Sequence, residues 1–153
     1  MGSIRTKAVC VFRRGNKILV RDSFDPQKRE AFYCPAGGGV EFGETSEAAV
    51  RREIMEELEA EIMNPRLLGV LENRFTFDGR PGHEIVFVYA AEFSDAALYT
   101  AERIMGKEGD GHEFTMVWLD LDKHTDKSPP IYPEGLVALL NNKQLGQPLR
   151  PAS

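Results

Sequence analysis

The sequence predicts an α/β fold, a sheet with helices on its faces, in a single domain. Alternating apolar runs typical of strands flank one segment with a helical period. With 153 residues, 42% of them hydrophobic, the chain is long enough for one core and too short for two ordinary domains. We expect this domain to span residues 1–146 and residues 147–153 to form a flexible tail.

Alternation and turn residues indicate the strands. Residues 6–12 suit a strand, and a Gly-Asn turn leads into residues 18–20, so we expect an opening hairpin. Residues 32–35 form a short extended run before three consecutive glycines. Further strands are expected at residues 66–77, in one or two pieces, 83–93 and 115–121.

The helical period lies at residues 47–58, where apolar residues recur four positions apart. Thr45 or Ser46 is available as the N-cap of this helix. A short closing helix is expected at residues 134–142. The buried stripe of the first helix would consist of Val50, Ile54 and Leu58.

Composition excludes several classes of function. Twenty-four acids against 19 bases give a net charge of −5, which disfavours binding to nucleic-acid polymers. Cys10 and Cys34 are too few for a disulfide scaffold and suit small buried residues. No run approaches the roughly 20 apolar residues of a membrane helix. The start lacks a secretory signal, so we expect a cytoplasmic protein with no membrane partner.

The chemistry is concentrated on the predicted helix. Glu53, Glu56 and Glu57 share a face beside the buried stripe, at spacings that make carboxylates repel one another. A divalent cation would relieve that repulsion, and ligation by oxygen alone favours Mg²⁺, or Mn²⁺ as a substitute, over Zn²⁺. The glycines at 37–39 lie just upstream and allow backbone atoms to approach a metal or an anion.

The bland alternative is a solvated, Glu-rich helix face, which is the common case. Solvated faces usually intersperse lysines, yet no Lys occurs between Lys28 and Lys107. Residues 41–61 hold eight glutamates and two arginines, a local charge of −6, while the rest of the chain sums to +1. The net negative charge is therefore concentrated in one segment. This segment would bind a polyphosphate only through divalent cations.

These residues resemble the signature of the Nudix hydrolases, a family that cleaves a nucleoside diphosphate linked to another group. Gly38 is followed after five residues by Glu44, and after seven more by the Arg-Glu-Ile-Met-Glu-Glu run at 52–57. The resemblance implies an α/β/α sandwich with a central mixed sheet. It also implies metal-dependent hydrolysis of a diphosphate linkage by water attack on phosphorus, in a (d)NTP or a nucleotide sugar such as ADP-ribose.

The same resemblance implies roles for individual residues. Arg52 paired with Glu44 would brace the glycine loop against the helix, because an arginine fork fits a carboxylate. The alternative for Arg52 is an exposed ion pair of little value. The implied metal ligands are Glu53, Glu56, Glu57 and the backbone carbonyl of Gly37.

One position departs from the family pattern. Where the signature normally ends in glycine, this chain has Glu59, followed by Ala60 instead of a larger aliphatic residue. Because Glu adopts the left-handed conformation less readily than glycine, we expect the helix to continue toward Met63.

Three carboxylates compete for the role of general base. Glu53 lies inside the signature, whereas Glu108 and Glu113 lie in a glycine-rich stretch before the last strand, and we favour Glu113 as base or extra ligand. Substrate contacts are expected from Gly38, Gly39, Arg74 and Phe75.

Other aromatic and basic residues are weaker candidates for substrate binding. Aromatic residues in strands usually pack in a core, so stacking of a nucleobase by any one of them is the less favoured interpretation. The histidines are expected to be ordinary loop and strand-entry residues. These weaker candidates are Phe77, Tyr89, Trp118, Arg80, His83 and His112.

Two other classes of function are weighed against hydrolysis. A Nudix-fold module that binds a nucleotide without hydrolysing it is disfavoured, because such modules commonly lose signature carboxylates. A structural Ca²⁺ site is disfavoured because the ligands lack the spacing of a calcium loop. The expected partner is a small nucleotide; a homodimer would fit the family, but no residue of the chain indicates one.

Overall fold

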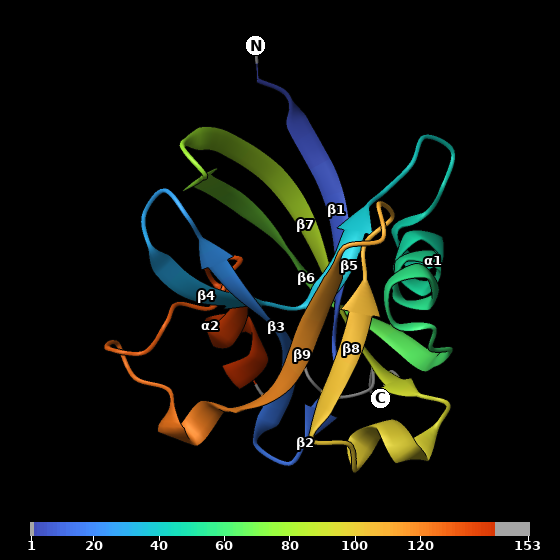
Figure 1. Cartoon of the computed structure of the whole chain (residues 1–153). Helices are drawn as coiled ribbons and strands as arrows, with labels where there is room; N and C mark the ends of the chain where they lie inside the picture. The colour runs from blue at the N-terminus through green and yellow to red at the C-terminus, as the bar shows by residue number, and fades with distance from the viewer. Residues whose placement is uncertain (1, 143–153) are drawn as a thin grey trace, which may run out of the picture.

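Within the described residues, the chain forms two β-sheets and two α-helices, and Figure 1 shows their arrangement. The computed structural model describes residues 2–142, so the tail expected at 147–153 lies outside the described residues. None of the described helices is long and apolar enough to cross a membrane. The elements are β1 Ile4–Val11, β2 Arg13–Arg14, β3 Lys17–Asp25, β4 Glu30–Cys34, β5 Ala36–Gly39, α1 Ser46–Leu58, β6 Ile62–Phe77, β7 Arg80–Phe93, η1 Ala96–Tyr99, β8 Arg103–Lys107, β9 Glu113–Asp120, η2 Leu121–Lys123 and α2 Leu136–Asn141, where η is a 3-10 turn.

The sheets lie between the two helices. The first sheet has the strand order β5-β1-β7-β6, and the second has β2-β3-β9-β8 with β4 beside β3. β1 and β7 run parallel while their other neighbours are antiparallel, so the first sheet is mixed. Helix α1 packs on β5, β1 and β8, and α2 packs on β6 on the other side (Figure 1). The predicted α/β/α arrangement with a mixed sheet is confirmed.

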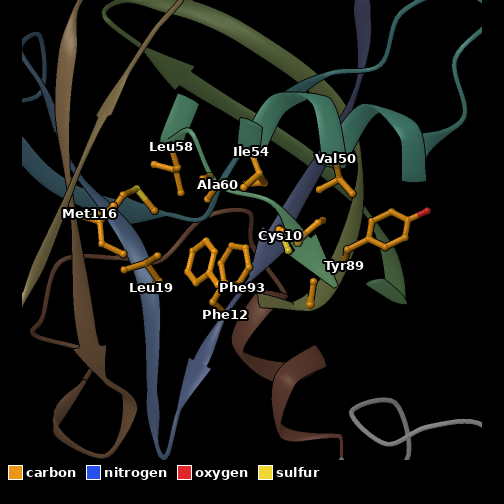
Figure 2. Packing of buried hydrophobic residues seen from close by; sticks show 14 of the residues in the cluster. Cys10, Phe12, Leu19, Val50, Ile54, Leu58, Ala60, Tyr89, Phe93 and Met116 are labelled. Carbon is orange, nitrogen blue, oxygen red and sulfur yellow. The ribbon is translucent and has the colours of Figure 1, made fainter. Parts of the chain in front are cut away.

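The β1 segment contributes to a separate core on each of its faces. Ala8, Cys10 and Phe12 belong to the core beneath α1, whereas Val9 and Val11 belong to the core beneath α2. Burial on both faces explains why the second half of this segment, residues 8–12, is continuously apolar. The predicted stripe of α1 packs on the first core (Figure 2) and consists of Val50, Ile54 and Leu58.

The start of α1 is set by Thr45. Its Oγ1 accepts a hydrogen bond from the backbone N–H of Ala48 at 3.1 Å, which satisfies a free donor of the first turn. Ser46, the other N-cap candidate, is instead hydrogen-bonded through Oγ to the hydroxyl of Tyr89 at 2.6 Å. The first turn is thereby attached to β7 as well as capped.

The expected extension of α1 toward Met63 is wrong. The helix ends at Leu58, and Glu59 adopts the left-handed conformation with φ 54°. That conformation costs roughly 1–2 kcal/mol for a residue other than glycine. It turns the chain so that Ala60 and Ile62 enter the core, and burial of an Ile side chain is worth about 1.5–3 kcal/mol. The burial of Ala60 and Ile62 therefore outweighs the cost of the left-handed conformation at Glu59.

The expected opening hairpin is only partly correct. β1 pairs with β5 and β7, and the hairpin is formed by the short strand β2 with β3. Residues 66–77 belong to one strand, β6, whose pairing with β7 is irregular near Pro65 and Leu68. Strands β5 and β8 were not expected, because glycine and charged residues interrupt the apolar alternation there.

Candidate active site

Arg52 joins the glycine loop to helix α1. Its Nε and Nη2 donate hydrogen bonds to the two carboxylate oxygens of Glu44, at 2.8 and 2.9 Å. Nη2 also donates to the backbone carbonyl of Gly39 at 2.9 Å. The bidentate geometry is the strong form of an arginine–carboxylate pair. Arg52 therefore forms the contact with Glu44 that the signature implies, and it reaches the end of β5 as well.

The remaining nitrogen of Arg52 faces the other glutamates of the helix. Nη1 donates to Glu53 Oε1 at 2.9 Å and lies 3.3 Å from Glu56 Oε2. The Glu53 side chain is only 16% exposed, whereas that of Glu56 is 59% exposed. Arg52 thus holds the Glu53 carboxylate more closely than that of Glu56, which is more exposed and makes the longer contact.

Glu57 lies beside Glu53 in a partly buried position. Burial, followed by the charge of Glu53, raises the pKa of Glu57 to about 8. The positive charges of Arg21 and Lys7 act in the opposite direction without cancelling the effect. It is unfavourable for two adjacent carboxylates to be negatively charged at the same time. Such a pair therefore favours binding of a proton or a cation between them.

The glycine loop fits closely against these groups. A Cβ atom at Gly38 would lie 2.5 and 2.7 Å from the two carboxylate oxygens of Glu53, so only glycine leaves room for that side chain. At Gly37, with φ 149°, a Cβ atom would lie 2.6 Å from the Cα of Val9 and would also strike the carbonyl oxygen of Ala8. The two glycines therefore have different roles: Gly38 leaves room for the Glu53 carboxylate, and Gly37 allows close packing against the backbone of β1.

The donor set fits a divalent cation held by oxygen ligands. Glu53 and Glu57 are adjacent, Glu56 is exposed enough to turn toward them, and these carboxylates match the preference of Mg²⁺. Within residues 2–142, no three His, Cys, Asp or Glu side chains already converge on one point. Since Arg52 contacts both Glu53 and Glu56, convergence would require a rearrangement of their carboxylates around the ion.

A cleft of about 610 Å³ opens near the carboxylates, between the two sheets. Lys7 of β1 and Arg21 of β3 line it, and these are the two cations whose charge acts on Glu57. Arg21 forms an ion pair with Glu108 at 2.5 Å and stacks over the ring of Phe114, with 4.2 Å from Cζ to the ring centroid. Lys7 is likewise ion-paired with Glu84, and both cations lie close enough to Glu57 for their charge to act on it.

Some of the predicted base and substrate residues line two hollows, whereas Glu53, Gly38 and Gly39 line neither. Glu113, Glu108 and Phe75 line the 610 Å³ cleft. Arg74 does not: it lies on the opposite face of β6 and lines a second hollow of about 760 Å³ together with His83. Phe75 touches both hollows.

The weaker aromatic and histidine candidates also separate. Phe77 and His112 line the cleft. Tyr89 is buried in the core with its hydroxyl bonded to Ser46, and Trp118 donates from Nε1 to a backbone carbonyl outside the cleft. Their role is packing, as aromatic residues in strands favour.

The sequence did not indicate site roles for several cleft residues, among them Lys7, Arg21, Asn73 and Glu84. The last two face each other across the β6–β7 hairpin, and each lies five residues from its Asp-Gly turn. Because a two-residue turn fixes the register of a hairpin, this pair is encoded in the sequence. Lys7 and Arg21 carry no comparable signal, since they lie on strands of different sheets and come together only where the two sheets pack.

The Glu44–Arg52 pair should make stability sensitive to acid. Hydrogen bonds from Arg52, then the backbone N–H of Glu41, lower the pKa of Glu44 to about 2. A lowered folded-state pKa means that this stability is present above about pH 4.5 and is lost as the pH falls toward 2. In denaturant unfolding between pH 2 and 7, Glu44→Gln should lose less stability below pH 4.5 than the parent. Glu41→Gln is the matched control, and identical pH profiles for Glu44→Gln and the parent would contradict the assignment.

Comparison with known proteins identifies the family of this site. A family model described as the NUDIX domain matches residues 4–137. A relative described as the uncharacterized Nudix hydrolase YvcI, from Bacillus subtilis (strain 168), is 30% identical over 113 residues. That match covers 74% of this chain and 64% of the relative, so the chain spans just under two thirds of that protein.

Solved structures have the same fold. The crystal structure of a MutT NUDIX hydrolase from Burkholderia pseudomallei matches with a TM-score of 0.64 and 23% identity, over 92% of this chain and 98% of that one. A NUDIX hydrolase from Nitrosomonas europaea matches with a TM-score of 0.64 and 15% identity, over 94% and 90% of the two chains. At these identities the likeness establishes the fold alone. Since the NUDIX model spans residues 4–137, including all of the contacts around Arg52, the chain belongs to the Nudix hydrolase family.

Proposed function

We propose that this chain hydrolyses the diphosphate linkage of a small nucleotide, in which a nucleoside diphosphate is joined to another group, with a divalent metal ion as cofactor. The observation that carries the proposal is the pairing of Glu53 with Glu57 beside a cleft lined by Lys7 and Arg21. Paired carboxylates favour a cation, and the nearby basic side chains favour phosphate oxygens. Together they suit a metal-assisted reaction at phosphorus.

The proposed cofactor is Mg²⁺, with Mn²⁺ as a substitute. When bound, a divalent cation neutralises charge that develops on phosphate oxygens during hydrolysis. The residues that would hold it are Glu53, Glu56, Glu57 and the carbonyl of Gly37. In this arrangement Arg52 orients Glu53 and attaches the glycine loop to the helix, so that the ligands approach from one side.

Glu113 is the proposed proton acceptor for the attacking water. It lies at the start of β9, exposed and lining the cleft, and it forms no ion pair within the described part of the chain. Glu108, its competitor, is already paired with Arg21. A carboxylate without a cationic partner is the better acceptor, because a paired cation stabilises the charged form and weakens the base.

The proposed substrate class is broad: a (d)NTP or a nucleotide sugar such as ADP-ribose. Arg21 would contact its phosphate groups from the cleft, close to the helix carboxylates. The cytoplasmic location expected from the sequence stays a prediction, as does the homodimer that would fit the family.

Metal removal should abolish activity. We expect phosphate or nucleotide release from a panel of nucleoside triphosphates, nucleotide sugars and dinucleoside polyphosphates to require Mg²⁺ or Mn²⁺, to stop with a chelator, and to return when metal is added in excess. Product analysis would identify the attacked phosphorus. Turnover that is unaffected by the chelator would contradict the proposal, and tight nucleotide binding without turnover across the panel would favour the non-hydrolysing binding module.

A further inference from the structure

Asn73 has a buried hydrogen-bond acceptor without a partner. The residue is 6% exposed, and its Oδ1 has no hydrogen bond to any described residue. A buried polar atom left unpaired costs free energy that an apolar side chain of similar shape would not. Asn73 lines the 610 Å³ cleft, so a ligand in that cleft could supply the missing donor.

A second buried acceptor stands directly opposite. Glu84 of β7 pairs with Asn73 of β6 in the strand register, and directly opposed residues in an antiparallel pair point to the same face. Glu84 is 7% exposed and also lines the cleft. Its described ion-pair partner is Lys7, with 3.7 Å between Nζ and Oε2, which leaves acceptor capacity on the carboxylate.

Aromatic rings line the same cleft. Phe32 makes edge-to-face contacts with Phe77 and Tyr132, with ring centroids 5.9 and 5.8 Å apart, and all three line the cleft along with Phe75. Buried acceptors among aromatic rings suit a flat heterocycle that stacks on its faces and donates hydrogen bonds from its edge. A phosphate would be repelled there by the Glu84 carboxylate.

Two turns beside the cleft are held together by hydrogen bonds to one buried side chain. The side chain of Asp25, itself 3% exposed, accepts hydrogen bonds through Oδ1 from the backbone N–H groups of Gln27, Lys28 and Asp78. Asp25 thereby ties the β3–β4 turn to the β6–β7 turn. The acceptor pair therefore sits inside a fixed frame, which is the arrangement that specific recognition needs.

We infer that Asn73 and Glu84 form a specificity site that selects nucleotides whose base carries an exocyclic amino group. The inference rests on the proposed function for the placement of the phosphates near Arg21. Amino hydrogens would be donated to Asn73 Oδ1 and to the Glu84 carboxylate, while the aromatic rings contact the base. A base with a carbonyl or a hydrogen in place of the amino group has fewer donors on that edge and would leave at least one of the two acceptors unpaired.

The test measures binding, so that it does not depend on turnover. Calorimetry would compare three pairs of nucleoside monophosphates that differ in an amino group: guanosine with inosine, adenosine with purine riboside, and cytidine with uridine. In the pair that binds most tightly, we expect the amino-bearing member to bind about tenfold or more tightly. Equal binding within every pair, or no measurable binding by any of the six compounds, would overturn the inference.

Variants separate specificity from folding. Asn73→Leu should reduce the amino preference to about twofold or less and should leave the melting temperature unchanged or higher, because it removes an unpaired buried acceptor. Glu84→Gln should reduce the preference as well, since an amide replaces one acceptor with a donor. The matched control is Glu72→Gln, an exposed glutamate on the opposite face of β6, which should change neither quantity. An amino preference that survives in both Asn73→Leu and Glu84→Gln would overturn the inference.

The outcomes also separate this inference from the proposed function. Hydrolysis of nucleotides without an amino preference would leave the proposed function standing and overturn the role of Asn73 and Glu84. An amino preference in binding, without hydrolysis of any nucleotide in the presence of Mg²⁺, would support the specificity site and overturn the proposed hydrolase activity.

Discussion

Replacement of Glu57 by Gln is expected to reduce diphosphate hydrolysis by about 100-fold or more at saturating Mg²⁺. The side chain keeps its size but loses the charge that, together with Glu53, makes this site favourable for a cation. The loss should appear in kcat and should not be recovered by raising the metal concentration from the millimolar range, measured as phosphate release on the best substrate of the panel.

The same variant should fold normally. Burial next to Glu53 already disfavours the charged form of Glu57, so a neutral amide removes repulsion and should leave the melting temperature of the metal-free protein unchanged or higher at pH 8. Glu47→Gln, which changes an exposed glutamate in the first turn of the same helix, is the matched control and should retain activity. Full activity of Glu57→Gln at matched metal would refute its proposed role.

The carboxylate helix was predictable because its information is local. The period of Val50, Ile54 and Leu58 and the spacing of the glutamates lie within two or three turns of one helix, where geometry follows directly from sequence. The end of that helix was not predictable from local preference. Glu59 adopts a left-handed conformation because burial of Ala60 and Ile62 outweighs its cost, and that burial depends on strands distant in the chain.

The cleft was predictable only in part, for a related reason. Asn73 and Glu84 belong to one hairpin whose turn sets their register, so their pairing follows from the sequence. Lys7 and Arg21 lie on β1 and β3, which belong to different sheets, and Glu113 joins them through the pairing of β9 with β3. The order of the strands and the packing of the two sheets determine which of these residues come close together. Neither can be read from one sequence.

Substitution of adjacent glycines should separate catalysis from folding. In Gly38→Ala, the new methyl group would overlap the Glu53 carboxylate, which is the mobile end of a long side chain and can move away. We expect the protein to fold with a melting temperature close to that of the parent. Activity should fall by about 10- to 100-fold, because Glu53 loses the position in which Arg52 holds it. Metal affinity, measured by titration of activity with Mg²⁺, should weaken in parallel.

Gly37→Ala should show the opposite balance. Its methyl group would strike the backbone of Ala8 and Val9 in the neighbouring strand, and its φ of 149° is unfavourable for alanine. Backbone cannot move aside as a side chain can, so we expect a loss of stability of about 1–3 kcal/mol or more in denaturant unfolding. Gly109→Ala, where no atom lies within 4 Å of the added methyl group, should change neither stability nor activity. A loss of stability in Gly38→Ala as large as that in Gly37→Ala would show that Gly38 is needed for packing. The proposal that Gly38 serves to leave room for the Glu53 carboxylate would then be wrong.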